Sequence, residues 1–502
     1  MQKVRQRRIG ITIMNRENFF SGFVWKFLEQ IISQIVSFTI SIVLARLLTP
    51  HDYGVVALVN VFIVIAGVFV TSGFSTSLIQ KKDADELDFS TIFYCSLALA
   101  CIIYLILFVS APFIANFYHN MQLSLVVRVF GLTLPILAVN SIQQAQVARH
   151  LAFKKIFFST TVATVVSGIF GIAFALMDFG VWALVFQYLI SNIASMFVLF
   201  IQISWRPKLM FSLKRAKSLM SYGWKVMAAD FLGTFFAQLR SLVIGRFYAP
   251  SALAFYNRGQ QLPNLLSNNI DTTISSVLFP YMSQAADDPK KMKEIVRRSL
   301  RISSYIIMPL MLGLMVTSKP IIILLLTSKW INAVPYMQWL CVASALSTIT
   351  NTNLQVMRAS GRSDILLKIE LIKKPVYLLL LLISIKISVL AVAITMTIYS
   401  FYAAIVNIRP NQRIIGYSYG EQLRDIAPSL ILSIVMAIVI WPISLLTLPA
   451  FGTLIIQIIC GATFYLLCSY LLRFEAFKYL NGFLITKIKG TNEVDKNESG
   501  LS

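Results

Sequence analysis

The sequence predicts an all-α integral membrane protein with about 14 transmembrane helices, arranged as two six-helix lobes followed by two C-terminal helices. Three observations support this fold class. First, 57% of the 502 residues are apolar and 13% are charged, whereas soluble domains contain about 25% charged residues. Second, apolar runs near the ~20 residues that cross a bilayer follow one another with short polar breaks. Third, short motifs recur in the same order about 200 residues apart.

Polar or charged residues mark the boundaries of the predicted spans. The break between the eleventh and twelfth spans is the weakest, because Lys386 alone interrupts the apolar run there. The spans cover residues 20–45, 55–80, 90–115, 121–148, 156–177, 181–203, 218–246, 254–285, 299–327, 334–357, 364–386, 388–408, 425–447 and 450–472.

Lysine and arginine alternate along the predicted loops. The two terminal tails and the even-numbered breaks together hold 32 of them, and the odd-numbered breaks hold four. Cytoplasmic loops of membrane proteins are enriched in Lys and Arg, so both termini are predicted to be cytoplasmic. The net charge of +23 is therefore a topology signal, and no nucleic-acid partner is expected.

Three pairs of matching motifs suggest that the first half of the chain was duplicated. Their offsets are 199, 200 and 209 residues, and each repeat contains six predicted spans. Because six is an even number, the two copies have the same orientation, as in transporters whose parallel repeats enclose a substrate cavity. The pairs are Trp25-Lys26 with Trp224-Lys225, Arg46-Leu-Leu-Thr-Pro50 with Arg246-Phe-Tyr-Ala-Pro250, and Gln146-Val-Ala-Arg149 with Gln355-Val-Met-Arg358.

The duplication and the charge pattern together predict the domain organisation. A basic stretch between the repeats is the predicted lobe linker, and both ends of the chain are polar tails. The segments are a cytoplasmic basic tail (1–19), an N-lobe with spans one to six (20–203), a cytoplasmic linker (204–217), a C-lobe with spans seven to twelve (218–408), spans thirteen and fourteen (409–472) and a cytoplasmic tail (473–502).

Several predicted spans carry polar residues on one helical face. The longest stripe follows span eight from Asn257 to Ser275, with spacings of three or four residues. Such groups can simply join helices, each contact contributing about 1 kcal/mol. A stripe that includes ionisable groups favours a water-filled cavity, and carboxamides suit sugar hydroxyls because they both donate and accept hydrogen bonds. The predicted polar lining consists of Asn257, Gln261, Asn264, Asn268, Asp271 and, from span one, Gln34.

Five cationic residues lie at apparent membrane depth. Arg128, Arg240 and Arg258 have no obvious partner nearby in the sequence, and a guanidinium suits phosphate oxygens. We therefore predict that these arginines bind an anionic substrate in the cavity. Lys26 and Lys225 lie near the cytoplasmic ends of their spans, where substrate contact and snorkelling towards the interface are both open.

Three acidic residues at the same depth, Glu29, Asp230 and Asp271, are candidates for ion coupling. An ionisable group inside a membrane usually faces a pathway or a partner. Glu29 lies one turn from Lys26, so an internal ion pair is the competing interpretation at that position.

Arg46 and Arg246 end spans one and seven on the predicted outer side, four residues before Pro50 and Pro250. Capping is one interpretation, because an arginine there meets the last carbonyls of its helix and a proline follows. An outer gate is the other, and the two are compatible.

The sequence predicts a transporter and not an enzyme, with no cofactor or metal. Three histidines lie in three different breaks, and five cysteines lie inside apolar spans without a paired spacing, which gives a metal or nucleophilic site little to build on. No GxxxxGK[ST] motif for ATP is present. The short outer breaks hold no carboxylate pair for a glycosyl-transfer site.

Three motifs resemble a known family. They are Ala45-Arg-Leu-Leu-Thr-Pro-His-Asp-Tyr-Gly54, Gly73-Phe-Ser-Thr-Ser-Leu-Ile-Gln-Lys-Lys82 and Ala254-Phe-Tyr-Asn-Arg-Gly-Gln-Gln-Leu-Pro263. These segments are similar to Wzx-type polysaccharide flippases, in the polysaccharide transporter family of the multidrug/oligosaccharidyl-lipid/polysaccharide exporter superfamily. The resemblance runs from about residue 18 to residue 472 and is nearest to the colanic acid and teichuronic acid exporter branch.

The resemblance implies movement of an undecaprenyl-diphosphate-linked oligosaccharide to the outer leaflet of the bacterial cytoplasmic membrane, by alternating access of the two lobes. The product would feed capsule, exopolysaccharide or O-antigen (lipopolysaccharide) assembly, with membrane lipid, a glycan polymerase and export machinery as further partners. Coupling to a proton or sodium gradient, or to the membrane potential, is also implied. The alternatives are a drug or peptidoglycan-precursor exporter of the same superfamily and, from another class, a membrane-embedded glycan polymerase.

Overall fold

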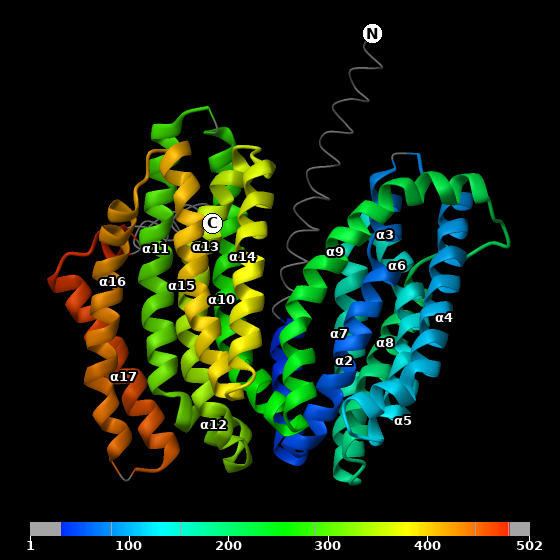
Figure 1. The fold of residues 1–502 in the computed structure, drawn as a ribbon, viewed down its shortest axis with the longest axis horizontal. Helices are drawn as coiled ribbons and strands as arrows, with labels where there is room; N and C mark the ends of the chain where they lie inside the picture. The colour runs from blue at the N-terminus through cyan, green and yellow to red at the C-terminus, as the bar shows by residue number, and fades with distance from the viewer. Residues whose placement is uncertain are drawn as a thin grey trace, which may run out of the picture. The chain divides into compact units, whose positions relative to one another are not determined.

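The computed structural model describes residues 32–481 except 82, 151, 286, 447 and 480, and only the backbone of residues 222, 277 and 363. Within this part of the chain every regular element is a helix, which confirms the predicted all-α class (Figure 1). The chain forms two compact units that divide between Ala254 and Phe255. We call them unit 1 and unit 2.

Unit 1 is a bundle of long helices that runs from blue to green in Figure 1. Its longest helices are α4 and α9, with 32 and 35 residues. The helices are Ile32–Leu47, α2 (Pro50–Thr71), α3 (Phe74–Gln80), α4 (Glu86–Phe117), α5 (Gln122–Gly131), α6 (Thr133–Arg149), α7 (Phe153–Leu176), α8 (Val181–Gln202) and α9 (Leu213–Phe247).

Unit 2 is a second helical bundle, drawn from green to red. The division falls within the first turns of α10, which carries the longest polar stripe of the sequence. Its elements are α10 (Pro250–Gln284), α11 (Pro289–Val316), α12 (Ser318–Leu326), the 3₁₀ turn η1 (Ser328–Ala333), α13 (Val334–Ala359), α14 (Ser363–Ser384), α15 (Val389–Ile414), α16 (Tyr419–Ile440), the 3₁₀ turn η2 (Trp441–Leu445) and α17 (Ala450–Leu471).

Every predicted span overlaps a helix, and ten helical segments of the described residues are long and apolar enough to cross a bilayer. The other four overlapping helices are Ile32–Leu47, α10, α13 and α14. The first is short in its described part, and the polar or charged residues of the other three lower their hydropathy. Fourteen crossings therefore stay a prediction, which rests on the alternating charge of the loops.

The turn into α2 is encoded by the motif around Pro50. Thr49 is the N-cap, and its hydroxyl and backbone N–H exchange hydrogen bonds with Asp52 in a capping box. Pro50 is the first helical residue, where its missing N–H costs no helical hydrogen bond. Four residues on, Gly54 lies against the backbone of Pro250, and a Cβ atom there would be 2.0 Å from the Pro250 carbonyl oxygen.

The second predicted span is broken near the end that the loop charges predict to be cytoplasmic. Gly73 has φ of +74° and separates α2 from α3, a backbone conformation that glycine adopts without steric penalty. A Cβ atom on Gly73 would also lie 2.6 Å from the carbonyl oxygen of Gly223 in α9. The hydroxyl of Ser77 donates to the carbonyl of Leu219 at 3.1 Å. The break thus lets α3 pack closely against α9.

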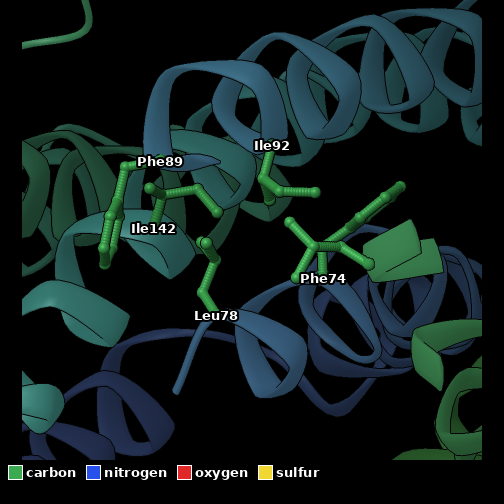
Figure 2. Packing of buried hydrophobic residues seen from close by; sticks show 6 residues of the cluster. Phe74, Leu78, Phe89, Ile92 and Ile142 are labelled. Atoms are coloured by element: carbon green, nitrogen blue, oxygen red, sulfur yellow. The ribbon is translucent and has the colours of Figure 1, made fainter. Parts of the chain in front are cut away.

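An apolar cluster fills the space around α3. Figure 2 shows its side chains converging from α3, α4 and α6. Packing of this kind excludes water and contributes about 25 cal/mol for each Å² of apolar surface that is buried. The labelled members are Phe74, Leu78, Phe89, Ile92 and Ile142.

The predicted linker, residues 204–217, lies on the first turn of α4. The backbone N–H groups of Lys208 and Ser212 donate to hydroxyls of α4 at 3.1 and 3.2 Å. Arg215 contacts Asp85 at 2.6 Å. The hydrogen bond from the backbone N–H of Asp88, together with Arg215, lowers the pKa of Asp85 to about 2. In the structure, α9 packs on α2, α3 and α4 in unit 1. The sequence-based assignment of span seven to the C-lobe stays a prediction.

Unit 2 is held together by buried polar contacts as well as apolar ones. Asn353 of α13 exchanges hydrogen bonds with Gln422 of α16 at 3.0 and 3.1 Å and accepts one from Asn411 of α15 at 2.6 Å. Near the same end, the buried carboxylate of Asp425 accepts hydrogen bonds from Arg297 and Arg301 of α11, at 2.6 to 3.1 Å. These contacts join α16 to α11 and α13.

Candidate substrate site

The polar stripe of α10 faces polar residues of α13. Asn351 Nδ2 donates to Asp271 Oδ2 at 2.5 Å, and Gln355 Nε2 donates to Ser275 Oγ at 2.9 Å. Both pairs are 80 residues apart, so the two helices run in the same direction here and meet at successive turns. The stripe is therefore a structured interface within unit 2.

A groove of about 690 Å³ follows this interface. Its charged lining residues are Asp271 and Arg358, and the other polar ones are hydroxyls and carboxamides. Such groups can bind sugar hydroxyls as donors and acceptors, and the arginine can bind an oxyanion. We call this the α10–α13 groove and define it by Asn268, Asp271, Ser275, Asn351, Gln355 and Arg358.

Arg258, on the same helix but further from the groove, is engaged by its neighbours. Its Nη1 donates to Gln261 Oε1 at 2.5 Å, and its guanidinium lies 5.4 Å from the ring centroid of Trp330. Asn257, Gln261 and Asn264 are half-buried on α10. The predicted polar lining of span eight thus shares one helix, with Asn268 and Asp271 in the groove and the others nearer its start.

The remaining predicted cations lie in unit 1. Arg128 of α5 donates to the carbonyl of Phe108 at 3.3 Å and lies 4.7 Å from the ring centroid of Phe108. This contact with α4 is a structural use of the guanidinium. Arg240 is half-buried in α9, and Lys225 and Asp230 are exposed on the same helix. The substrate role of these cations and the coupling role of Asp230 stay predictions.

Four predicted positions belong to the first span and its outer end. Lys26 and Glu29 lie outside the described residues, so neither their ion pair nor a role in substrate contact or coupling is tested. Gln34 is half-buried in the helix Ile32–Leu47, and Arg46 is exposed in its last turn.

Arg246 lies in the last turn of α9, beside an apolar groove of about 680 Å³ in unit 1. Its guanidinium is 4.9 Å from the ring centroid of Phe117. Its place at the helix end agrees with the expected effect of a cation on the helix dipole. Pro50 and Pro250 begin α2 and α10. A gating role for these four residues is not tested by this arrangement.

Sequence reasoning missed Arg358, because its position at the end of span ten placed it among the loop charges. The available signal was its motif, since Gln355 lies three residues earlier on the same face. A second omission is Lys373 in the middle of α14, whose Nζ is 2.6 Å from Glu370 and whose side chain is 6% exposed. The spacing of three residues was the visible signal there.

Comparison with known proteins places this fold. The polysaccharide biosynthesis protein family matches residues 43–335, more than half of the chain. The chain belongs to this family. Its relatives include the teichuronic acid biosynthesis protein TuaB of Bacillus subtilis, 24% identical over 70% of this chain and 73% of the relative. The lipopolysaccharide biosynthesis protein WzxC of Escherichia coli is also 24% identical, over 71% and 73% of the two chains.

Solved structures show the same fold for this polysaccharide biosynthesis protein. The lipid II flippase MurJ, in an inward closed conformation, superposes with a TM-score of 0.74, at 15% identity over 90% of this chain and 99% of that one. An inward-facing MATE family transporter of the MOP superfamily gives 0.59, at 15% identity over 79% and 98%. The fold is therefore that of the multidrug/oligosaccharidyl-lipid/polysaccharide exporter superfamily. Together with its family, this makes the protein a multi-pass membrane transporter of polysaccharide biosynthesis.

Proposed function

We propose that this protein is a flippase that moves undecaprenyl-diphosphate-linked oligosaccharides across the bacterial cytoplasmic membrane by alternating access. The observation that carries the proposal is the α10–α13 groove, which offers carboxamides, hydroxyls and an arginine inside a membrane helix bundle. An oligosaccharide needs many hydrogen-bond partners, and its carrier brings a diphosphate. The helix pair α10 and α13 offers both the hydrogen-bond partners for sugars and a cation for the diphosphate.

The names of the relatives support a glycan as the cargo. One is a teichuronic acid biosynthesis protein, one a succinoglycan biosynthesis transport protein and one a lipopolysaccharide biosynthesis protein. We therefore propose a repeat unit of a surface polysaccharide, for capsule, exopolysaccharide or O-antigen, which a glycan polymerase and export machinery would take up. The likeness to the lipid II flippase concerns the fold alone at 15% identity, so it does not favour a peptidoglycan precursor.

Asp271 is the acidic residue of the groove, and we propose it as the residue that couples transport to a proton or sodium gradient. Its carboxylate is half-buried and accepts a hydrogen bond from Asn351. A carboxylate at membrane depth can bind a proton or a cation and change its hydrogen bonds when it does. In proteoliposomes, Asp271→Asn should translocate at a rate that no longer responds to an imposed gradient. A gradient response equal to that of the wild type would exclude this role.

The proposed function is tested by the distribution of lipid-linked repeat units between the two leaflets. In a strain that lacks this protein, the units should accumulate in the cytoplasmic leaflet, and expression of the wild-type protein should return them to the outer leaflet. Mass spectrometry of the accumulated lipid identifies the glycan. Normal translocation in the strain without the protein would contradict the assignment.

A further inference from the structure

The last turns of α6 and α13 carry the same motif but meet different neighbours. The motif is Gln146-Val-Ala-Arg149 in unit 1 and Gln355-Val-Met-Arg358 in unit 2. Both arginines lie in the last turn of their helix. Equivalent residues that are used differently indicate where the two repeats have diverged.

In unit 1 the arginine is a structural cap. Arg149 Nη1 donates to the carbonyl oxygens of Leu78 and Lys81 at 3.0 and 2.6 Å. These carbonyls lie at the end of α3, and the last carbonyls of a helix have no partner within the helix itself. Arg149 satisfies them, and the space beside α3 is filled by the apolar cluster of Figure 2.

In unit 2 the corresponding arginine lines the groove together with α10. α10 continues without a break to Gln284, and the turn that lines the groove with Arg358 contains Phe279 and Pro280. The Arg358 side chain is exposed, and it makes no hydrogen bond, ion pair or ring contact with any residue that the structure describes. Its guanidinium therefore has its donors available to a ligand in the groove.

The residue seven positions before each arginine also differs between the two units, from apolar in unit 1 to polar in unit 2. Ile142 is buried in the apolar cluster of unit 1, whereas the equivalent Asn351 bonds to Asp271 in the groove. Asn351 lies two turns, or about 10 Å, from Arg358 along α13. Asp271 accepts a hydrogen bond from this carboxamide, and it forms no ion pair with Arg358. The packed cluster of one repeat corresponds to an open polar groove in the other.

We propose that Arg358 is the phosphate-binding residue of the α10–α13 groove and holds the diphosphate of the lipid carrier, a proposal that rests on the proposed function. The planar guanidinium offers paired donors that match phosphate oxygens. The positive charge of the loops predicts that this end of α13 lies on the cytoplasmic side, where the carrier would be loaded. Sugars attached to a diphosphate at Arg358 lie next to the carboxamides of Gln355 and Asn351.

Binding to the purified full-length protein in lipid nanodiscs tests the proposal, with undecaprenyl diphosphate and undecaprenol as probes. The wild type should bind the diphosphate more tightly than the alcohol. Arg358→Gln should weaken diphosphate binding by ~10- to 100-fold, the range for a lost charged hydrogen bond, and leave undecaprenol binding unchanged. Arg358→Lys should fall between the two, because an ammonium keeps the charge and loses the planar fork.

Two other arginines provide matched controls. Arg362 is exposed, lies four residues further on and pairs with Asp364 at 3.1 Å, so Arg362→Gln should bind the diphosphate as the wild type does. Arg149→Gln should lower the unfolding temperature, because two carbonyls at the end of α3 lose their partner, and should leave diphosphate affinity unchanged. Arg358→Gln should unfold at the wild-type temperature.

Diphosphate binding that is equal in the wild type and Arg358→Gln would overturn the proposal, and would point to a charged group on the glycan instead. A loss of the same size for undecaprenol would overturn it as well, because the effect would not concern phosphate. A different result would contradict the proposed function, namely that expression of the wild-type protein leaves the distribution of lipid-linked units between the leaflets unchanged. If Arg358→Gln translocated the units at the wild-type rate, the role of Arg358 would be contradicted and the proposed function would not.

Discussion

Gly54→Ala tests the close approach of Gly54 to the backbone of Pro250 in unit 1. The added Cβ would lie 2.0 Å from the carbonyl oxygen of Pro250, 2.2 Å from its carbonyl carbon and 2.8 Å from its Cα. All three are backbone atoms, so no rotation of a side chain can relieve the contact. Non-bonded carbon atoms prefer separations of about 3.5–4.0 Å. The start of α2 and the start of α10 must therefore move apart by roughly 1 Å or more.

The expected loss of stability follows from this geometry. Overpacking typically costs about 1–3 kcal/mol, and a clash with backbone atoms belongs at the upper end of that range. A loss of about 3 kcal/mol lowers the unfolding temperature of a domain of this size by roughly 6–12 °C. The same displacement changes the region of Pro50 and Pro250, so we also expect slower translocation.

Two other glycines calibrate the measurement. A Cβ on Gly245 would meet the end of the Leu58 side chain at 2.0 Å, and a Cβ on Gly233 would have nothing within 4 Å. Because Leu58 can rotate away, Gly245→Ala should cost about 1 kcal/mol. Gly233→Ala should change stability by no more than about 0.5 kcal/mol.

Thermal unfolding of the purified protein in detergent, followed by tryptophan fluorescence, gives the order of the three variants. The reasoning requires the largest decrease for Gly54→Ala, a smaller one for Gly245→Ala and almost none for Gly233→Ala. If Gly54→Ala unfolded at the same temperature as Gly233→Ala, the close approach of Gly54 and Pro250 would be refuted.

Three further predictions concern charges and the groove. Lys373→Met should destabilise the protein by about 2 kcal/mol. This is below the range for a fully buried ion pair, because Glu370 is half exposed. In thermal unfolding, the double variant Lys373→Met with Glu370→Gln should recover most of the lost stability. The stabilising contact of Asp85 with Arg215 should be present above about pH 4 and lost as the pH falls to about 2, because the pKa of Asp85 is lowered in the folded state. The difference in unfolding temperature between the wild type and Asp85→Asn should therefore vanish in that pH window. A difference that stays constant with pH would contradict this prediction. Asn351→Leu should slow translocation at least tenfold, because the half-buried carboxylate of Asp271 loses a charged hydrogen bond worth about 1.5–3 kcal/mol. A wild-type rate of movement between the leaflets would contradict a role for the groove.

The main features of the fold could be predicted because they depend on local patterns. Apolar runs located the helices, and even the weak break at Lys386 separates α14 from α15. The Thr-Pro-x-Asp pattern at residues 49–52 is a capping box in the structure. The break at Gly73 could not be located within the apolar run of span two, because it depends on how closely α3 approaches α9.

The candidate site was only partly predictable, for a different reason. Periodicity put the predicted polar lining of span eight on one helical face, and the groove includes two of those predicted residues, Asn268 and Asp271. The sequence could not identify the partner helix of that face. Arg128 has a local use against Phe108, which lies 20 residues away in the chain, whereas Arg358 was assigned to a loop and lines the groove.

The sequence by itself determined the membrane class, the helices, the duplicated motifs and the family, because hydropathy, charge and short-range capping are local properties of the chain. Tertiary structure alone decided how equivalent residues are used. Arg149 caps α3 because α2 breaks at Gly73, and Arg358 remains available because α10 is continuous. Two matching motifs thus differ through contacts with segments about 70 to 80 residues away. Such contacts exist only once the helices have packed, and this is why they could not be read from the motif.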